Sequence, residues 1–182
     1  MLPEVRVIVE RAAARRASLE GLIDAIPDDY WTRRATGEAW SARDHLAHVA
    51  GIDVMTSETL TQILAGNRAA SIAGATTPEE LTARRDALLD EAATMAVAAL
   101  RERMRRTRAG LVRLLASLDA GHLEATVLVA GVVDAWGEPL AFGLRRYLVS
   151  LPDHDTEHEQ AIRRAISAPP DLSAVALTRR RT

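Results

Sequence analysis

Apolar residues recur every three or four positions over most of this chain, which is the spacing expected for one face of an α-helix. The pattern extends over four long segments: residues 4–26, 40–66, 78–118 and 143–167. Polar and charged residues fill the other positions, so each segment has one face to bury and one to leave in water. The pattern therefore predicts a protein built mainly from four long helices.

The expected helix boundaries carry local signals. Ser41 is a good N-cap residue, and Asp44 three positions later completes a pattern like a capping box. Thr77 is a second N-cap candidate, because Pro78 and two glutamates follow it. Gly66 has the position of a C-cap at the end of the second segment. These signals fix two helix starts and one helix end.

Two of the expected helices are interrupted. The third segment continues for about forty residues, which is long for a helix of a globular protein. We expect it to bend or break, either at Gly110 or within residues 92–99. In the last segment Pro152 removes one backbone hydrogen bond, so we expect a kink just before His154.

The connections between the helices differ in character. Residues 67–76 are rich in alanine, serine and glycine, and we expect a loop without regular structure. Residues 127–133 are instead rich in valine, which favours a strand, and residues 136–139 form a turn sequence. This pattern predicts a short hairpin or an irregular crossover between the third and fourth helices.

These elements together indicate the fold class. Four long helices, short turns and one long crossover between helices 3 and 4 predict an all-α four-helix bundle. A chain of 182 residues is long enough for one domain with a substantial core. We assign residues 1–167 to this single domain and residues 168–182 to a C-terminal tail.

The composition excludes several classes of function. The chain has no cysteine, so it forms no disulfide and offers no thiolate ligand to a metal. A net charge of −2 gives no general attraction to nucleic acid or to anionic membranes. No apolar run is long enough to span a bilayer, and the N-terminus does not resemble a signal peptide. We therefore expect a cytoplasmic protein that binds neither nucleic acid nor membrane.

Three histidines are the candidate functional residues of the chain. His154 and His158 are one helical turn apart on the apolar face of the last segment, and His48 lies on the second. Imidazoles with this spacing reach one metal ion together. Three protein ligands leave coordination positions open, which is typical of a catalytic metal rather than a structural one. The alternative is that the three are hydrogen-bonded core histidines.

Other polar residues lie close to these ligands in the sequence. Asp155 and Glu157 flank the last pair, and the one that turns inward is expected to orient an imidazole N–H or to act as a base. His45 precedes His48 by three residues, and we expect it at the surface or hydrogen-bonded behind the ligands.

The ordered set of motifs resembles the DinB/YfiT-like superfamily. The resemblance extends from about residue 19 to residue 166 and is carried by Tyr30-Trp31, by residues 37–51 around Leu-Ala-His48, and by residues 154–162. It implies a DinB/YfiT-type four-helix bundle, often a dimer, with three histidines that hold zinc or nickel. The matching ligands are His48, His154 and His158. Related enzymes include S-transferases and an isomerase that use bacillithiol or mycothiol.

The resemblance leaves three functions open. The first is a metal-dependent thiol S-transferase, which joins an external low-molecular-weight thiol to a small electrophilic substrate. The second is a hydrolase that uses metal-bound water. The third is a non-catalytic module for metal binding or dimerisation. We expect the first, with a homodimer as the assembly and zinc or nickel as the metal.

Overall fold

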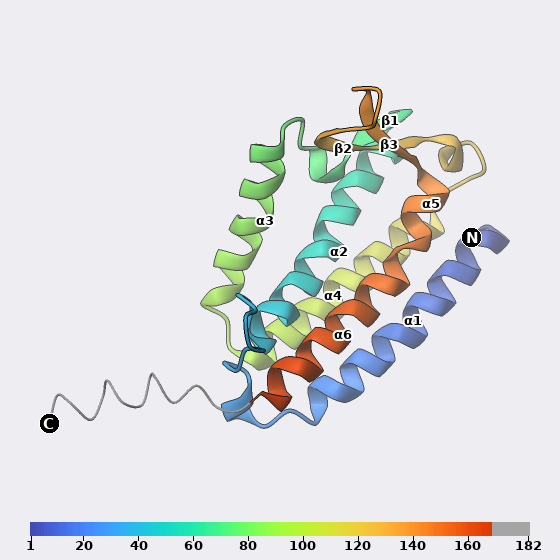
Figure 1. Ribbon diagram of the computed structural model, residues 1–182. Coiled ribbons are helices and arrows are strands. Elements are labelled where there is room, and N and C mark those ends of the chain that lie inside the picture. Colours follow the sequence, from blue (N-terminus) through green and yellow to red (C-terminus); the bar gives the residue numbers. More distant parts are fainter. Residues whose placement is uncertain (169–182) are drawn as a thin grey trace, which may run out of the picture.

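Four long helices lie side by side in the computed structural model, which describes residues 1–168. They are α1 (Pro3–Asp24), α2 (Ala42–Leu64), α4 (Val97–Ala116) and α6 (Leu151–Ser167). Helix α2 packs against α4 and α6, and α1 packs against α6 and α4 (Figure 1). The shorter α3 (Pro78–Ala93) packs mainly on α2. Apart from residue 168, the expected C-terminal tail lies outside the described residues.

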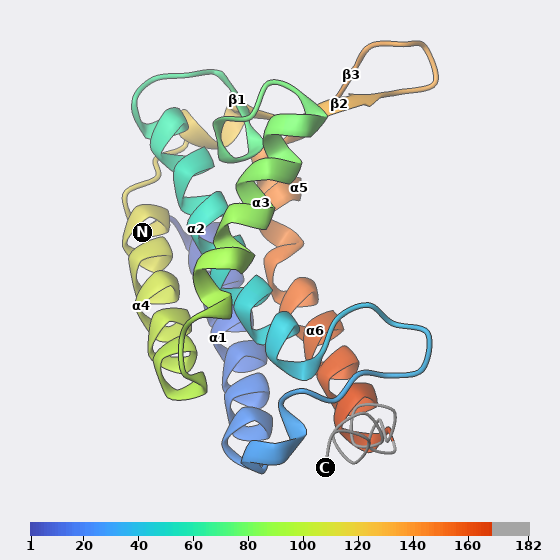
Figure 2. The ribbon, with the colours of Figure 1, turned by 90° about the vertical axis from the view of Figure 1, so that its left-hand side faces the viewer.

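The break expected within residues 92–99 is found there, and it separates two antiparallel helices. Helix α3 ends at Ala93 and α4 begins at Val97, so the chain reverses between them (Figure 2). The Arg43 guanidinium of α2 donates hydrogen bonds to the Ala92 oxygen at 3.1 Å and the Ala93 oxygen at 2.9 Å. It also donates to the Met95 oxygen. Arg43 thus satisfies carbonyl groups that the end of α3 leaves without helical partners.

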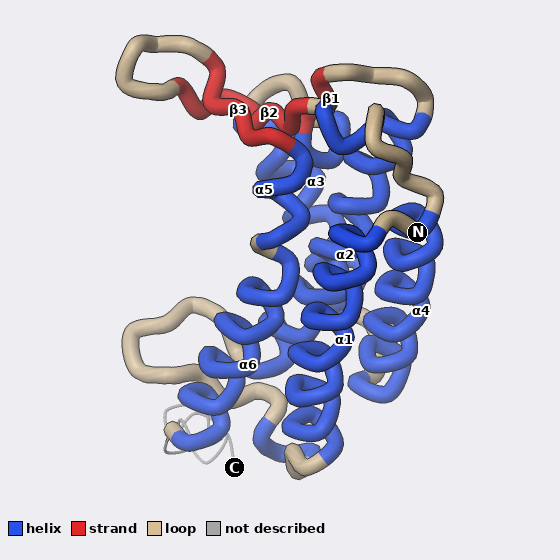
Figure 3. The backbone as a smooth tube through the Cα atoms, turned by 90° about the vertical axis from the view of Figure 1, so that its right-hand side faces the viewer, coloured by secondary structure: helices blue, strands red, loops and turns tan. Residues whose placement is uncertain are grey.

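The prediction of an all-α fold needs a correction, because a three-stranded sheet lies at one end of the helices (Figure 3). Strand β1 (Ala69–Ser71) pairs in parallel with β2 (Thr126–Val133), which forms the expected hairpin with β3 (Pro139–Gly143). The protein is therefore mostly helical with a small sheet. The expected loop at residues 67–76 contains β1 because this strand pairs with a partner that is distant in sequence, which local composition does not reveal.

The predicted helix starts are confirmed. The Asp44 N–H donates to Ser41 Oγ at 3.2 Å, and the Ser41 N–H donates to Asp44 Oδ2 at 2.8 Å. Thr77 and Glu80 form the same reciprocal pair at the start of α3. Gly66 has a φ of +99° just after α2, a conformation that favours glycine.

The last predicted helix is divided in two. A single residue, Ser150, separates the short α5 (Leu144–Val149) from α6. Pro152 is the second residue of α6. Proline has no N–H to donate, so the expected kink becomes a break. The His154 N–H donates to the Ser150 oxygen at 3.1 Å, which means that regular helical bonding resumes before the histidines. Both histidines therefore lie on one uninterrupted helix.

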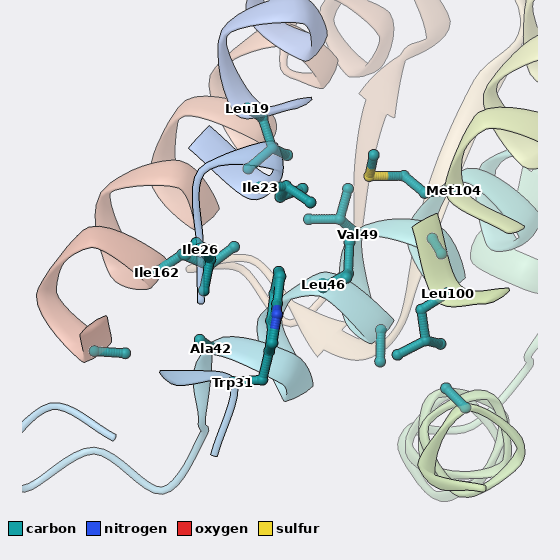
Figure 4. Close-up of a cluster of buried hydrophobic side chains, with 14 residues drawn as sticks. Leu19, Ile23, Ile26, Trp31, Ala42, Leu46, Val49, Leu100, Met104 and Ile162 are labelled. Carbon is teal, nitrogen blue, oxygen red and sulfur yellow. The ribbon is translucent and has the colours of Figure 1, made fainter. Parts of the chain in front are cut away.

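The core supports the helices that carry the histidines. Figure 4 shows the Trp31 ring beside Ile26 and Leu46, in a cluster to which α1, α2, α4 and α6 all contribute. Trp31 is only 3% exposed, so it fixes the loop before α2 against the core. Within residues 1–168, no helix combines the length and the apolar content that crossing a membrane requires.

Candidate metal centre

Two packed helices bring four imidazoles together. His45 and His48 lie three residues apart on α2, and His154 and His158 lie four apart on α6. Each spacing places its two side chains on one helical face. His45 faces His158, with a distance of 2.9 Å between their Nδ1 atoms. His48 faces His154, with 3.3 Å between their Nε2 atoms.

Three of these imidazoles have the arrangement of a metal site. One nitrogen each of His48, His154 and His158 lies within 4.8 Å of the other two. The ring centroids of His154 and His158 are 4.5 Å apart, and those of His48 and His158 are 4.8 Å apart. Nitrogens bound tetrahedrally at about 2.0–2.1 Å from a zinc ion are about 3.3 Å from each other. The separation of the His48 and His154 nitrogens, 3.3 Å, fits this value.

The environment keeps the three imidazoles neutral. Burial lowers the pKa of His48 and of His154 to about 4, and for His48 the neighbouring His154 adds to the effect. Burial and the surrounding histidines lower the pKa of His158 to about 2. A neutral imidazole has the free lone pair that a divalent cation needs. The donors therefore fit a divalent transition-metal cation, and all three side chains are half-buried.

An indole ring covers one side of the imidazoles. The Trp40 ring centroid lies 4.8 Å from that of His48, 5.3 Å from that of His45 and 6.2 Å from that of His158. Trp40 immediately precedes the N-cap of α2, so the start of the helix also sets the position of the ring. The indole limits access of water to this side of the cluster.

A buried ion network lies next to the histidine cluster through Asp155, the neighbour of His154, and each of the four long helices contributes one residue to it. Its members are Arg16 of α1, Asp53 of α2, Arg108 of α4 and Asp155 of α6. The two carboxylates are at most 1% exposed, and each lies within 3.2 Å of both guanidinium groups. Two positive and two negative charges balance, which makes their burial tolerable.

Sequence analysis missed three members of this network. Each stands on the apolar face of its helix: Arg16 follows Ala12 by four residues, and Arg108 follows Met104 by four. Asp53 likewise follows the buried Val49 by four residues. Charged residues at core positions, with opposite signs on different helices, are the signal that points to a buried network.

The two acids next to the ligands are placed differently from what we expected. Asp155 turns inward, but its carboxylate accepts hydrogen bonds from Arg16 and Arg108. Glu157 is exposed. Within residues 1–168, neither of them forms a hydrogen bond with an imidazole. The residue that hydrogen-bonds to His158, one of the three candidate ligands, is instead His45 on the facing helix.

Comparisons with known proteins identify the family and the fold of the chain. A family model described as the DinB superfamily matches residues 11–162. A crystal structure of the mycothiol-dependent maleylpyruvate isomerase superposes with a TM-score of 0.68 at 16% identity. The superposition covers 88% of this chain and 61% of that enzyme, so the chain spans about three fifths of the enzyme's length. A histidine-to-alanine mutant of the isomerase superposes equally well, at 15% identity over the same shares of both chains. No curated protein sequence matches the chain.

Proposed function

This chain belongs to the DinB superfamily, and from that premise we propose that it is a divalent-metal-dependent enzyme acting with an external low-molecular-weight thiol. The reaction we propose joins the whole thiol to a small electrophilic molecule: a bond forms between the thiol sulfur and an electrophilic carbon, the thiol proton is released, and the displaced electron pair moves to a leaving group or into the substrate. The observation that carries the proposal is the convergence of three neutral imidazoles from α2 and α6 on one point.

The residues of the chain have separate tasks in this proposal. His48, His154 and His158 hold the cation with neutral donors, so its full positive charge remains available to a fourth partner. A cation bound there lowers the pKa of a thiol in contact with it and so supplies a nucleophile at neutral pH. Trp40 shields one side of the cluster from water. The chain has no cysteine, so the thiol comes from outside.

The similar structure supports the thiol in particular. That protein is a mycothiol-dependent isomerase, and it shares the fold of this chain at low sequence identity. A thiol cosubstrate is therefore our proposal for this chain, as are zinc or nickel as the metal. We further propose that the four long helices form the family's four-helix bundle, that the protein is a homodimer, and that it works in the cytoplasm on a small molecule without nucleic acid.

Metal analysis is the first test. Wild-type protein purified without an affinity tag should contain about one zinc or nickel ion per chain, and His158→Ala should contain almost none. His122→Ala is the matched control, because His122 pairs with Asp119 in a short turn far along the chain from the site and should not affect metal content. A wild type that stays metal-free after incubation with both metals would overturn the proposal.

Thiol dependence of turnover is the second test. The metal-loaded enzyme is incubated with an electrophilic substrate, with and without mycothiol, bacillithiol or glutathione, and both products and free thiol are measured. Consumption of thiol that disappears in His158→Ala supports the transferase. Turnover that is independent of thiol shows a hydrolase with the same ligands, and metal binding without turnover of any substrate shows a non-catalytic module.

A further inference from the structure

One buried imidazole has no task in the proposed metal centre. His45 lies on α2 and is 7% exposed, which is a costly position for a polar ring without a partner. Its Nδ1 atom lies 2.9 Å from Nδ1 of His158. Two neutral imidazoles form a hydrogen bond at this distance only if one of these two nitrogens carries its proton.

Metal binding by His158 determines which of the two rings donates the hydrogen bond. The Nδ1 atom of His158 faces His45, so its Nε2 atom is the nitrogen that remains for the cation. A neutral imidazole that gives the Nε2 lone pair to a metal has its proton on Nδ1. The Nδ1–H of His158 therefore donates, Nδ1 of His45 accepts, and His45 has its own proton on Nε2.

The surroundings of His45 agree with this proton arrangement. Its Nε2 atom is buried and forms no hydrogen bond within residues 1–168. The Glu38 Oε2 atom lies 3.8 Å from it, while Glu38 Oε1 accepts a hydrogen bond from Arg164 Nε at 3.1 Å. An N–H directed toward a carboxylate is attracted to it, whereas a lone pair in the same place would be repelled. The proton on Nε2 thus lies on the side of the Glu38 carboxylate, while Nδ1 is left to accept the hydrogen bond from His158.

We propose that His45 is a positioning residue of the metal centre. His45 accepts a hydrogen bond from the Nδ1–H of His158. This bond fixes the tautomer of the His158 ring and holds the His158 Nε2 atom toward the cation. This inference rests on the proposed function, because it assumes that His158 is a ligand. Partners behind metal ligands typically contribute about 10–100-fold to metal affinity, so the hydrogen bond should be measurable.

Replacements of His45 test the hydrogen bond directly. The Zn²⁺ affinity of the metal-stripped protein is measured by competition with a chelator for wild type, His45→Leu, His45→Asn and His122→Ala. Leucine fills the space without an acceptor and should weaken binding about 10–100-fold. Asparagine offers an amide oxygen near the place of Nδ1 and should recover most of the affinity. Circular dichroism of the metal-free variants checks that each one folds.

The outcomes separate this inference from the proposed function. A wild type that binds neither Zn²⁺ nor, in the same assay, Ni²⁺ overturns both the proposed function and the role of His45. Normal affinity in His45→Leu, together with loss of binding in His48→Ala, removes only the role of His45. Equal loss in His45→Leu and His45→Asn also overturns it, because packing alone would then explain the effect.

Spectroscopy of the zinc-loaded protein tests the proton positions. Long-range ¹H–¹⁵N NMR spectra should show His158 protonated on Nδ1 and His45 protonated on Nε2. X-ray absorption should count three imidazoles around zinc, both in wild type and in His45→Asn. Four imidazoles in wild type and three in the variant would overturn the inference, because His45 would then be a ligand itself.

Discussion

Arg16 of α1 and Asp155 of α6 form a bidentate ion pair beside His154, one of the three candidate metal ligands. The Arg16 Nη2 atom lies 2.8 Å from Asp155 Oδ1, and the Arg16 Nε atom lies 3.1 Å from Oδ2. Such paired contacts between guanidinium and carboxylate are among the strongest side-chain hydrogen bonds. Asp155 is adjacent to His154 in the sequence, so the same ion pair also fixes the turn of α6 that carries the ligand.

Replacement of this carboxylate should destabilise the whole protein. Asp155→Asn leaves two buried guanidinium groups with the single negative charge of Asp53. Removing one partner of a buried pair costs about 3–5 kcal/mol, and we expect a loss of this size in the free energy of unfolding. Urea denaturation measures it.

A surface pair provides the control for that measurement. Arg106 and Glu102 are 3.9 Å apart on α4, and both side chains are largely exposed. Glu102→Gln should change the free energy of unfolding by less than about 1 kcal/mol. A similarly small change for Asp155→Asn would show that the buried network contributes little to stability.

The metal-free protein should lose stability in mild acid. Unfolded imidazoles bind a proton near their ordinary pKa of about 6.5. Folded His48 and His154 bind it only near a pKa of about 4, because burial opposes the charge. Between these values the unfolded state binds more protons, so stability rises with pH and falls as the pH drops from about 6.5 toward 4. Thermal unfolding of chelator-treated protein across this range measures the effect.

One histidine variant tests the cause of this acid sensitivity. His158→Gln removes a group whose folded pKa is lowered to about 2. The melting temperature of this variant should therefore depend less steeply on pH than that of wild type. His122→Gln should retain the wild-type slope. Equal slopes in all three proteins would assign the acid sensitivity to groups outside the histidine cluster.

The end of α3 should depend on Arg43. Arg43→Ala removes the hydrogen bonds to the carbonyl oxygens of Ala92, Ala93 and Met95, and hydrogen bonds to charged groups contribute about 1.5–3 kcal/mol each. We expect faster amide exchange in residues 93–100 and a lower free energy of unfolding. Arg85→Ala should alter neither, because the only ion pair of Arg85 among the described residues is with its neighbour Asp86.

Two glycines should respond to alanine in opposite ways. Gly131 has a φ of +67°, and an added Cβ would lie 1.9 Å from Pro78 Cγ, so Gly131→Ala should destabilise the contact between β2 and α3 by about 1–3 kcal/mol. Gly21 lies within α1 with nothing within 4 Å of an added Cβ. Gly21→Ala should stabilise the protein by about 0.5–1 kcal/mol. Chemical denaturation compares the two, and a stable Gly131→Ala variant would contradict the close approach of Pro78.

Local signals in the sequence predicted the helix starts well. The side chains of Ser41 and Thr77 cap N–H groups only a few residues away, so short motifs contain the whole interaction. The three convergent histidines were also predictable, because a helix fixes the spacing of His154 and His158 and the family motif supplies His48.

The features that the sequence did not predict depend on contacts between residues that are far apart in the chain. Strand β1 exists because Ala70 pairs with Val127. The sequence left the break open between Gly110 and residues 92–99, and the structure shows the second, where Arg43 from another helix bonds to the free carbonyl groups. For His45 the sequence left two positions open, at the surface or hydrogen-bonded behind the ligands, and the structure shows the second, with His158 as its partner. Packing of α2 against α6, rather than sequence distance, selects the group that contacts the ligand.

The division of the ligands between α2 and α6 has a consequence for biosynthesis. His48 and His154 are 106 residues apart, and α6 is the last helix among the described residues. A growing chain that has emerged from the ribosome only as far as α4 offers His45 and His48 but neither of the other two imidazoles. In the proposed centre, metal capture is thereby postponed until these helices have assembled, and an occupied centre marks a polypeptide in which α2 and α6 have already packed together.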